Sequence, residues 1–445
     1  MSAVAGISVD SGFKVSGSAD IENEQTKILK AKGMEFYLGH KAEQIKNPDI
    51  VVRSAAVPEN NPEVREAQRR NIPVYLYSEY LGMIMGEKRG VAVAGTHGKT
   101  TTTGVTAAIL TDANLEPTVV CGGVMNGFCS NSVFGKGDYF ISEACEYNRS
   151  FLDLKKWYTV VTNIENDHLD YYRDIEDIKQ AFFDFLKTSD RRGFSVVNGD
   201  DKNIIEILKG IHEQKMFTVG FEASNQYIIE GIENQKGLYS FVIMNQNRSV
   251  LNLNLSVPGR FNCINAALSA VFALKIGVNQ SVIEKSVNSF TGMQRRLEYL
   301  GEIAGNAVYS DYAHHPTEIN FTLSALREKH PGRKICVVFQ PHQYSRTAEL
   351  FHDFVKELLG ADYIILTEIY RQRDSDAYVA AVSSSDLFKA LKRISGNKKV
   401  IHVKRNEEIS SLLHGLDHEN KVIVFMGAGD IDDVARQFSG YSSFL

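Results

Sequence analysis

The stretch from Gly90 to Thr103 reads GVAVAGTHGKTTTT and decides the fold of this chain. Residues 91–94 are apolar and predict a buried strand, which ends in a turn of small residues. Gly95 and Gly98 let the backbone curl so that its N–H groups converge on anionic oxygens, and Lys99 adds a point charge. A helix expected over residues 101–114 then points its positive end at the same place. This order of strand, turn and helix predicts a phosphate-binding loop.

The loop is of a shorter type than the general phosphate-loop pattern, because Val93 stands where that pattern has a glycine. Its remaining features are complete, with a lysine followed by a threonine whose hydroxyl suits Mg²⁺. The residues expected to surround the phosphates of a nucleotide are Gly95, Thr96, His97, Gly98, Lys99, Thr100 and Thr101.

Length and composition restrict the classes of protein that the chain can belong to. Its 445 residues predict about three domains. With 49 basic and 54 acidic residues the net charge is −5, and the absence of a Lys/Arg-rich tract argues against a nucleic-acid partner. No apolar run approaches the ~18 residues of a membrane span. Five cysteines without a CxxC pair predict buried, reduced thiols in a cytoplasmic protein.

Strand-like and helical patterns alternate along most of the chain, which predicts α/β layers with mostly parallel sheets. We expect domain boundaries at residues 1–88, 89–292 and 293–445. Between residues 216 and 255, short alternating runs predict a small antiparallel sheet. The expected strands are residues 13–16, 50–53, 74–77, 91–94, 139–143, 160–163, 195–198, 308–311, 335–339, 363–367, 400–403 and 422–426.

The first domain departs from this scheme at its beginning. The chain opens as MSAVAGIS, an apolar helical pattern with no strand before it. In a doubly wound nucleotide-binding unit the first strand is central, and its glycine-rich turn holds the pyrophosphate. We therefore expect a Rossmann-like first domain that lacks its first strand and is incomplete.

Two polar segments follow strands that should lie beside the phosphate loop. EACEYNRSFLDL begins at Glu143, and NIENDHLDYY contains His168, so both residues are candidates for a metal site completed by Thr100. Mg²⁺ prefers oxygen ligands, and an imidazole would favour Mn²⁺ or act through water. Asp167 and Asp170 flank His168 and could orient it. A solvated cap at Glu143 and a structural histidine are the alternatives.

The last third of the chain carries two more polar clusters at strand ends. SDYAHHPTEI offers Asp311, Tyr312, His314 and His315, and FQPHQYSRT offers His342, Tyr344, Ser345 and Arg346. A helix start explains Pro316 and Glu318 without any function. Arg295 and Arg296 stand at the second domain boundary, where they are either solvated linker residues or suited to reach a phosphoryl group.

Taken together, GTHGKTTTT, EACEYNRSFL, TNIENDHLDYY, PGRFNCINA, QRRLE, SDYAHHPTE, FQPHQYSRT and MGAGDI resemble the Mur ligase family. The resemblance is strongest to the alanine-adding branch. It implies a UDP-sugar domain, a central ATPase domain and a C-terminal Rossmann-like domain. The implied reaction uses ATP and Mg²⁺ to turn the lactyl carboxylate of UDP-N-acetylmuramate into an acyl phosphate, which L-alanine then attacks.

The resemblance also implies roles for single residues. Lys99, His168, Arg296, His342 and Arg346 would be catalytic, with Thr100, Glu143 and His168 as metal ligands. Asn262 and Asn265 would lie on the adenine side, and Arg296 and Asp311 would contact phosphate and ribose. The residues expected to contact the substrates are Ser16, Asp20, Tyr312, His315, His342 and Arg346.

The chain also departs from the family pattern. Phe261 replaces an adenine-side histidine, and Gln343 stands where an arginine is frequent. The later ligases of the pathway carry a carbamoylated lysine where residues 182–184 read Phe-Phe-Asp, which favours the alanine-adding branch. Two alternatives stay open: a ligase that recycles murein peptides, and a nucleotide-binding protein inactive without its first strand. A monomer or a homodimer is expected.

Overall fold

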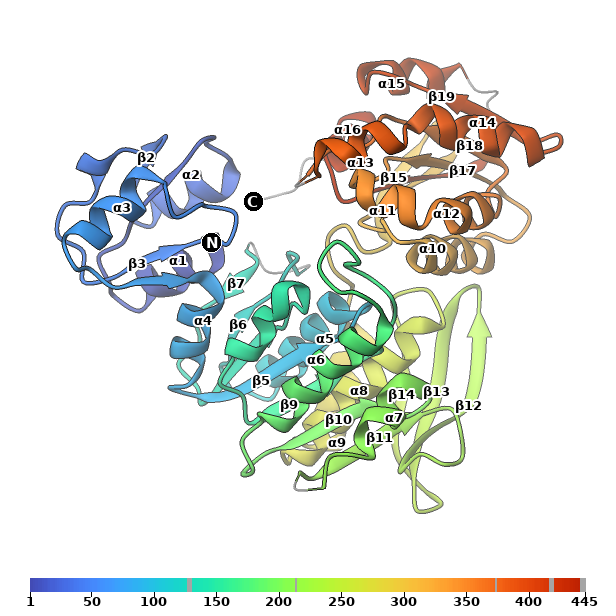
Figure 1. The fold of residues 1–445 in the computed structure, drawn as a ribbon. Coiled ribbons are helices and arrows are strands. Elements are labelled where there is room, and N and C mark those ends of the chain that lie inside the picture. The colour runs from blue at the N-terminus through green and yellow to red at the C-terminus, as the bar shows by residue number, and fades with distance from the viewer. Residues whose placement is uncertain (126–129, 213, 373, 416–419, 441–445) are drawn as a thin grey trace.

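The computed structural model describes residues 1–125, 130–212, 214–372, 374–415 and 420–440. Three bodies are visible in Figure 1. We name them the N-terminal unit, whose helices and strands lie within residues 2–85, the central unit, within residues 89–289, and the C-terminal unit, within residues 298–439. Among the described residues the central unit holds a ten-stranded sheet and the C-terminal unit a six-stranded sheet. Most neighbouring strands in both are parallel, which confirms the α/β class.

The N-terminal unit contains two separate pairs of parallel strands, β1 with β2 and β3 with β4. Its elements are α1 (Ser2–Asp10), β1 (Ser16–Ala19), α2 (Glu24–Ala31), β2 (Glu35–Leu38), η1 (Ala42–Gln44), β3 (Val51–Arg53), α3 (Pro62–Arg69), β4 (Val74–Leu76) and α4 (Tyr77–Met85). The opening residues are helical, as expected. The first strand lies three positions later than predicted, because Phe13 is 64% exposed and takes no part in a sheet.

The central sheet has the strand order β14-β13-β12-β11-β10-β9-β5-β8-β6-β7. Its strands are β5 (Arg89–Ala94), β6 (Thr118–Val120), β7 (Ser132–Val133), β8 (Tyr139–Glu143), β9 (Tyr158–Val161), β10 (Phe194–Asn198), β11 (Met216–Gly220), β12 (Tyr227–Gln235), β13 (Leu238–Asn245) and β14 (Arg248–Asn254). The antiparallel pairing predicted between residues 216 and 255 is confirmed for β12, β13 and β14, but these strands extend the central sheet and do not form a small sheet of their own. β11 pairs in parallel with β10, and β12 to β14 continue the same sheet.

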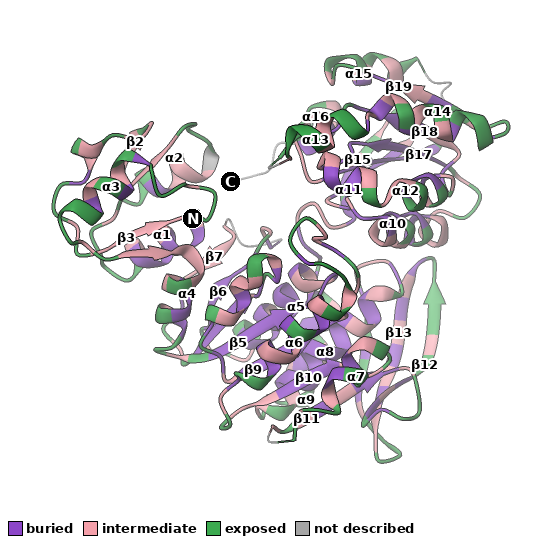
Figure 2. Ribbon diagram, viewed as in Figure 1, coloured by how far each residue is buried: buried purple, intermediate pink, exposed green. Residues whose placement is uncertain are grey.

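Strand β5 lies between β8 and β9, and its residues 91–94 are fully buried. Figure 2 shows the buried strands running through the middle of this unit. Burying a valine side chain of this kind stabilises the fold by about 1.5–3 kcal/mol. Helices cover both faces: α5 (Lys99–Asp112), α8 (Phe261–Lys275) and α9 (Gln280–Ser289) on one, α6 (Ile175–Lys187) and α7 (Lys202–Leu208) with α1 and α4 on the other. The sheet therefore holds the phosphate loop on a rigid base.

The C-terminal sheet has the order β15-β16-β20-β17-β18-β19, parallel except for β15. Its elements are β15 (Glu298–Ile303), β16 (Asn306–Asp311), α10 (Pro316–Lys329), β17 (Lys334–Phe339), α11 (Tyr344–Glu349), α12 (Phe351–Leu358), β18 (Tyr363–Leu366), α13 (Asp376–Ala381), α14 (Ser384–Ile394), β19 (Lys399–His402), α15 (Glu407–His414), β20 (Lys421–Met426) and α16 (Ile431–Ser439). In the part of the chain that the structure describes, no helix is long and apolar enough to cross a membrane.

Candidate active site

The phosphate loop joins β5 to α5 and depends on two glycines. Gly95 and Gly98 have φ angles of 141° and 82°, values that L side chains rarely adopt. A Cβ atom on Gly98 would lie 2.5 Å from Asn265 Oδ1, so the loop also needs the space that glycine leaves. The sequence-predicted strand, turn and helix are confirmed, with α5 beginning at Lys99.

Lys99 is held inside the loop by two carbonyls and one carboxylate. Its Nζ donates to Gly95 O at 2.5 Å, Thr96 O at 3.0 Å and Glu146 Oε1 at 2.9 Å. Burial alone would lower the pKa of Lys99, but Glu146 together with Cys145 and Glu143 raises the pKa, so the ammonium is charged. Glu146 is only 2% exposed, and its Oε2 has no hydrogen-bond partner.

Thr100 and Glu143 meet on the other side of the loop. The Thr100 hydroxyl donates to Glu143 Oε1 at 3.2 Å, and the N–H of Gly122 donates to Glu143 Oε2 at 2.8 Å. Arg296 Nη2 reaches the Thr100 hydroxyl at 3.0 Å. A hydroxyl beside a carboxylate is an oxygen donor set that fits Mg²⁺.

His168 lies with a different group of carboxylates. Its Nε2 is 3.6 Å from Glu146 Oε1 and 3.7 Å from Asp167 Oδ2. Burial opposes its charge, but Asp167 and Glu146 raise its pKa. Within the described residues no three His, Cys, Asp or Glu side chains are grouped as a metal cage. The structure thus brings Thr100 and Glu143 together and connects His168 to Lys99 through Glu146.

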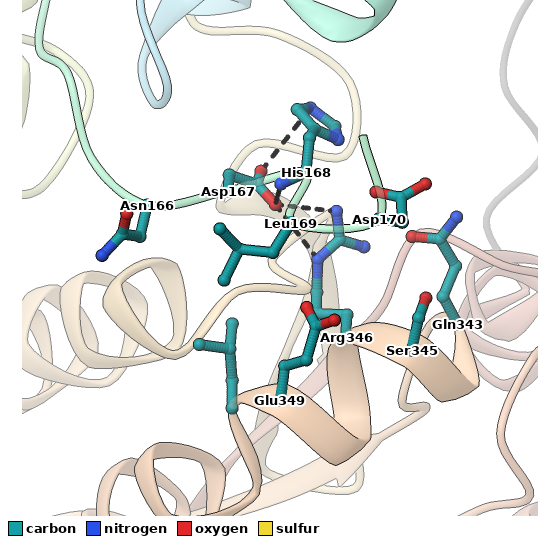
Figure 3. A pocket seen from close by; sticks show the side chains of 10 residues that line it. Asn166, Asp167, His168, Leu169, Asp170, Gln343, Ser345, Arg346 and Glu349 are labelled. Carbon is teal, nitrogen blue, oxygen red and sulfur yellow. Dashed lines mark hydrogen bonds and ion pairs between the residues drawn. The ribbon is translucent and has the colours of Figure 1, made fainter. Parts of the chain in front are cut away.

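Arg346 pairs with Asp167 across the boundary between two units (Figure 3). Its Nε and Nη2 donate to Asp167 Oδ1 at 3.3 and 3.0 Å, and both side chains are almost fully buried. Arg346 Nη1 is 3.4 Å from His342 Nδ1, and His342 Nε2 is 2.9 Å from Gln372 Oε1. A pocket here is lined by Asn166, Asp167, His168, Leu169, Asp170, Gln343, Ser345, Arg346, Glu349 and Leu350.

Glu318 is a site residue that the sequence reasoning missed, because its position in a helix start explained it. Its Oε1 lies 3.3 Å from His97 Nδ1 and 3.9 Å from Arg296 Nη1. Glu165 Oε2 is 3.6 Å from the other nitrogen of His97. Glu146 was missed as well, although it follows the same strand as Glu143. Both lie inside the quoted motifs, three residues after the candidates Glu143 and His315, and a second carboxylate within a motif is the signal that could have found them.

The remaining candidates of the C-terminal unit contact different partners. Asp311 is buried and accepts from the N–H of Leu297 and Ala313 and from the Thr322 hydroxyl. Burial raises the pKa of Asp311 to about 6. Tyr312 lies between the guanidinium groups of Arg295 and Arg296, 4.8 and 4.9 Å from its ring centre. His315 packs against His97 with ring centres 4.9 Å apart.

The adenine-side candidates lie at the start of α8. Asn265 Nδ2 donates to Asn262 Oδ1 at 3.1 Å, and Asn262 Nδ2 donates to Pro258 O at 2.8 Å. Phe261 stacks on Phe321 of α10, with ring centres 5.3 Å apart. The Phe261 ring, which stands where the family has a histidine, is therefore stacked on a side chain of another unit.

The candidates in the N-terminal unit are more exposed. Ser16 is the first residue of β1, Asp20 follows its last residue, and both are exposed. Asp20 Oδ1 is 3.6 Å from His40 Nε2, while His40 Nδ1 is 2.8 Å from Glu63 Oε2. The Ser18 hydroxyl donates to that same Glu63 oxygen at 2.5 Å. A polar cluster thus lies beyond the carboxyl ends of β1 and β2.

The cysteines are thiols in the described part of the chain. Cys121, Cys263 and Cys336 are buried, as expected, but Cys145 is exposed, contrary to expectation. Cys121 Sγ lies 3.6 Å from Glu143 Oε2. Cys129 lies outside the described residues.

Comparison with family models gives three consecutive matches. Residues 1–89 match "Mur ligase family, catalytic domain", residues 93–273 match "Mur ligase middle domain", and residues 295–429 match "Mur ligase, glutamate ligase domain". The three matches together cover most of the chain.

Curated relatives match almost end to end. A UDP-N-acetylmuramate–L-alanine ligase of Aquifex aeolicus is 40% identical over 438 residues, 98% of this chain and 94% of that protein. The Clostridium novyi protein of the same name is 39% identical over 439 residues, with the same coverage. The solved structure of UDP-N-acetylmuramate-alanine ligase from Thermotoga maritima is 28% identical, has a TM-score of 0.83, and covers 99% of this chain and 96% of that one.

Proposed function

The chain belongs to the Mur ligase family, and from this premise we propose which of its residues join L-alanine to UDP-N-acetylmuramate at the expense of ATP. The ligase acts in peptidoglycan precursor synthesis, and its two stages share one site. The lactyl carboxylate attacks the γ-phosphorus of ATP, releasing ADP and forming an acyl phosphate. The amine of L-alanine then attacks the acyl carbon, loses a proton, and expels phosphate as the amide forms.

Both stages build negative charge on phosphoryl and carbonyl oxygens, so cations fixed before the reaction stabilise both transition states. Lys99 is such a cation, because Gly95 O, Thr96 O and Glu146 hold its ammonium within the loop. Arg296 is a second, anchored on Thr100 at 3.0 Å. We assign the β- and γ-phosphates to Lys99 and the transferred phosphoryl group to Arg296.

We assign Mg²⁺ to Thr100 and Glu143, whose contact at 3.2 Å supports this choice. Bound there, Mg²⁺ would neutralise phosphate charge and polarise the γ-phosphoryl group. His168 is a candidate for a second cation, for which its imidazole favours Mn²⁺. Glu146 supports this, because its Oε1 lies 3.6 Å from His168 Nε2 and its Oε2 has no hydrogen-bond partner.

Arg346 and His342 are our candidates for the substrate carboxylates. The guanidinium of Arg346 already binds a carboxylate, that of Asp167, with two hydrogen bonds to one oxygen. L-alanine offers the same chemical group, so it can replace Asp167 as the partner of Arg346. Tyr312 and His315 lie on the same unit, where we propose that they contact the muramoyl group.

Asn262 and Asn265 are proposed adenine contacts, and Ser16 and Asp20 are proposed contacts of the UDP-sugar. We place the enzyme in the cytoplasm, an assignment supported by the unbridged Cys121, Cys145, Cys263 and Cys336. We propose that it works as a monomer or a homodimer.

The observation that carries the proposal is the assembly of Lys99, Thr100, Glu143 and Arg296 around one loop, in a chain 40% identical to an alanine ligase. The test is ADP release by the purified protein. We expect release only when both UDP-N-acetylmuramate and L-alanine are present. Turnover with a free tripeptide in place of L-alanine would overturn the assignment and indicate the recycling ligase.

A further inference from the structure

Helix α10 contacts two units with two different sides. Ile319, Leu323 and Leu326 are buried in the core of the C-terminal unit. The residues that contact the central unit are Thr317, Glu318, Phe321 and Glu328. Spacings of four and seven residues put Thr317, Phe321 and Glu328 along one side of a helix. α10 therefore docks the C-terminal unit on the central unit along one of its sides, in addition to the Arg346–Asp167 pair of α11.

The docking contacts run along the whole helix. The Thr317 hydroxyl donates to Glu165 Oε2 at 3.1 Å. Further along, Phe321 stacks on Phe261. Near the end, Glu328 Oε2 accepts from the Tyr239 hydroxyl at 2.7 Å. Only the first turn of the helix contacts a residue of the phosphate loop, among the residues described.

Glu318 stands in that first turn and uses its two oxygens differently. Oε2 accepts from the backbone N–H of His314 at 3.0 Å and of His315 at 3.2 Å, which caps the helix. Oε1 faces His97 Nδ1 at 3.3 Å and Arg296 Nη1 at 3.9 Å. Capping accounts for the first oxygen and leaves the second without a structural explanation.

His97 transmits this contact to the loop because its own backbone is firmly held. Its N–H donates to Asn163 Oδ1 at 2.8 Å, and its carbonyl accepts from the Thr162 hydroxyl at 2.6 Å and from Asn163 Nδ2 at 3.0 Å. Two residues later comes Lys99. Arg296, the other partner of Oε1, bonds to Thr100. The Glu318 carboxylate thus contacts His97, which precedes Lys99, and Arg296, which binds the residue after Lys99.

We propose that Glu318 is a positioning residue that couples docking of the C-terminal unit to the phosphate loop, by orienting His97 and Arg296 beside the triphosphate. The inference deepens the proposed function and rests on it, since it supposes that ATP binds at this loop. When the C-terminal unit moves away, the loop loses both orienting contacts. The loop is then shaped for phosphoryl transfer only in the docked arrangement.

The charges around His97 support this coupling. Burial alone would lower its pKa, but Glu165 and Glu318 together raise the pKa to about 9, so the imidazolium is present at neutral pH. His315 also faces the ring, and burial together with His97 lowers its pKa, so it adds no charge. The Glu318 carboxylate also interacts with Arg296 and His314. Burial lowers the pKa of His314 to about 3. A cation thus stands between carboxylates of two units.

The test compares Glu318→Gln with Glu328→Gln on the same helix. Glutamine keeps an oxygen for the capping bonds of Glu318 but removes its charge from His97. Glu328→Gln weakens docking at the far end and leaves the loop untouched. The first readout is the titration of ¹⁵N-labelled histidines, with the His97 signal assigned by its loss in His97→Gln. We expect the His97 midpoint to fall by at least about one pH unit in Glu318→Gln and to stay unchanged in Glu328→Gln.

The second readout is a double-mutant cycle on kcat/KM for ATP. We expect Glu318→Gln and His97→Gln each to lower it by about 10- to 100-fold, and the double variant to lose no more than the worse single one. In the control cycle, the separate effects of His97→Gln and Glu328→Gln on kcat/KM should multiply in the double variant. Independent effects of Glu318 and His97, or an unmoved His97 titration, would overturn the inference. Failure of the wild-type protein to turn over would count against the proposed function alone, because the titration needs no substrate.

Discussion

Arg346 donates two hydrogen bonds to one oxygen of Asp167, at 3.0 and 3.3 Å, and the two residues belong to different units of the chain. Burial alone would raise the pKa of Asp167, but Arg346 together with His168, His315 and His314 keeps the pKa well below the usual range. An arginine whose carboxylate partner lies across a unit boundary can exchange that partner for a substrate. The pair is therefore both a contact between units and a model of substrate binding.

We predict that Arg346→Lys raises the KM for L-alanine by about 10-fold or more, because lysine keeps the charge but cannot make the forked contact. The KM for ATP should change far less. Initial rates at saturating ATP and UDP-N-acetylmuramate measure the effect. Arg371→Lys is the control, since Arg371 is exposed and pairs with Asp376 on the surface. Equal changes in both Michaelis constants would remove Arg346 from the alanine site.

Asp167 should also matter for stability. We predict that Asp167→Asn lowers the free energy of unfolding by about 3 kcal/mol, because it leaves a buried guanidinium without its counter-ion. Replacing both residues, as in Asp167→Asn with Arg346→Met, should cost less than that. Urea unfolding of the three proteins decides the matter. If the double variant is the least stable, the ion pair itself stabilises the fold, and the loss in Asp167→Asn is not caused by the unpaired guanidinium.

Lys99 is expected to dominate the rate. We predict that Lys99→Ala lowers kcat by at least about 10²–10³-fold, the usual cost of removing one charge-stabilising donor. Glu146→Gln should lower kcat less, because the carbonyls of Gly95 and Thr96 still hold the ammonium. Single-turnover ADP formation measures both. A larger effect of Glu146→Gln would mean that Glu146 itself contacts a metal or substrate.

The metal site can be tested by removing the cation. A chelator should abolish ADP release, and Mg²⁺ should restore it. Glu143→Gln should raise the Mg²⁺ concentration for half-maximal rate by about 10- to 100-fold, because it removes the carboxylate of the proposed site. Glu165→Gln is a control outside that set. An unchanged requirement in Glu143→Gln would exclude this carboxylate as a ligand.

The phosphate loop and the strands on either side of it, β8 and β9, were predictable from the sequence. A short apolar run before a glycine turn and a helical pattern predicts a buried strand that leads into a helix, and β5 and α5 follow that pattern. The antiparallel strands β12 to β14 were predicted as a small sheet, but they extend the central one. Alternating apolar residues indicate that strands form a sheet, but they do not indicate which sheet the strands extend. That depends on β11 pairing in parallel with both β10 and β12.

Site residues in a recognisable motif could be predicted from the sequence. A residue that also has a structural role in its own helix could not. Glu318 caps α10, so its local pattern gave no reason to look further, and its contact with His97 joins residues 221 positions apart. Asp311 shows the opposite case. Its motif suggests a ligand contact, while its carboxylate is satisfied within its own unit by Leu297, Ala313 and Thr322.

Lys156 offers a test of buried charge away from the site. It is 2% exposed, and its ammonium lies 4.3 Å from the ring centre of Phe185 and 3.0 Å from the Thr188 hydroxyl. Burial lowers the pKa of Lys156 from 10.5 to about 7. Between these values the unfolded chain binds more protons than the folded one, so the free energy of unfolding rises with pH across this window.

We therefore predict that Lys156→Met stabilises the protein at pH 7, by about 2 kcal/mol, and that the gain shrinks as the pH approaches 10.5. Methionine fills a similar volume without a charge to desolvate. Urea unfolding at several pH values measures the difference from the wild type. Lys155→Met is the matched control, because Lys155 is the exposed neighbour and should show no such pH dependence. A gain that stays constant from pH 7 to 10.5 would mean that Lys156 has the same pKa in the folded and the unfolded chain, and its burial would then carry no electrostatic cost.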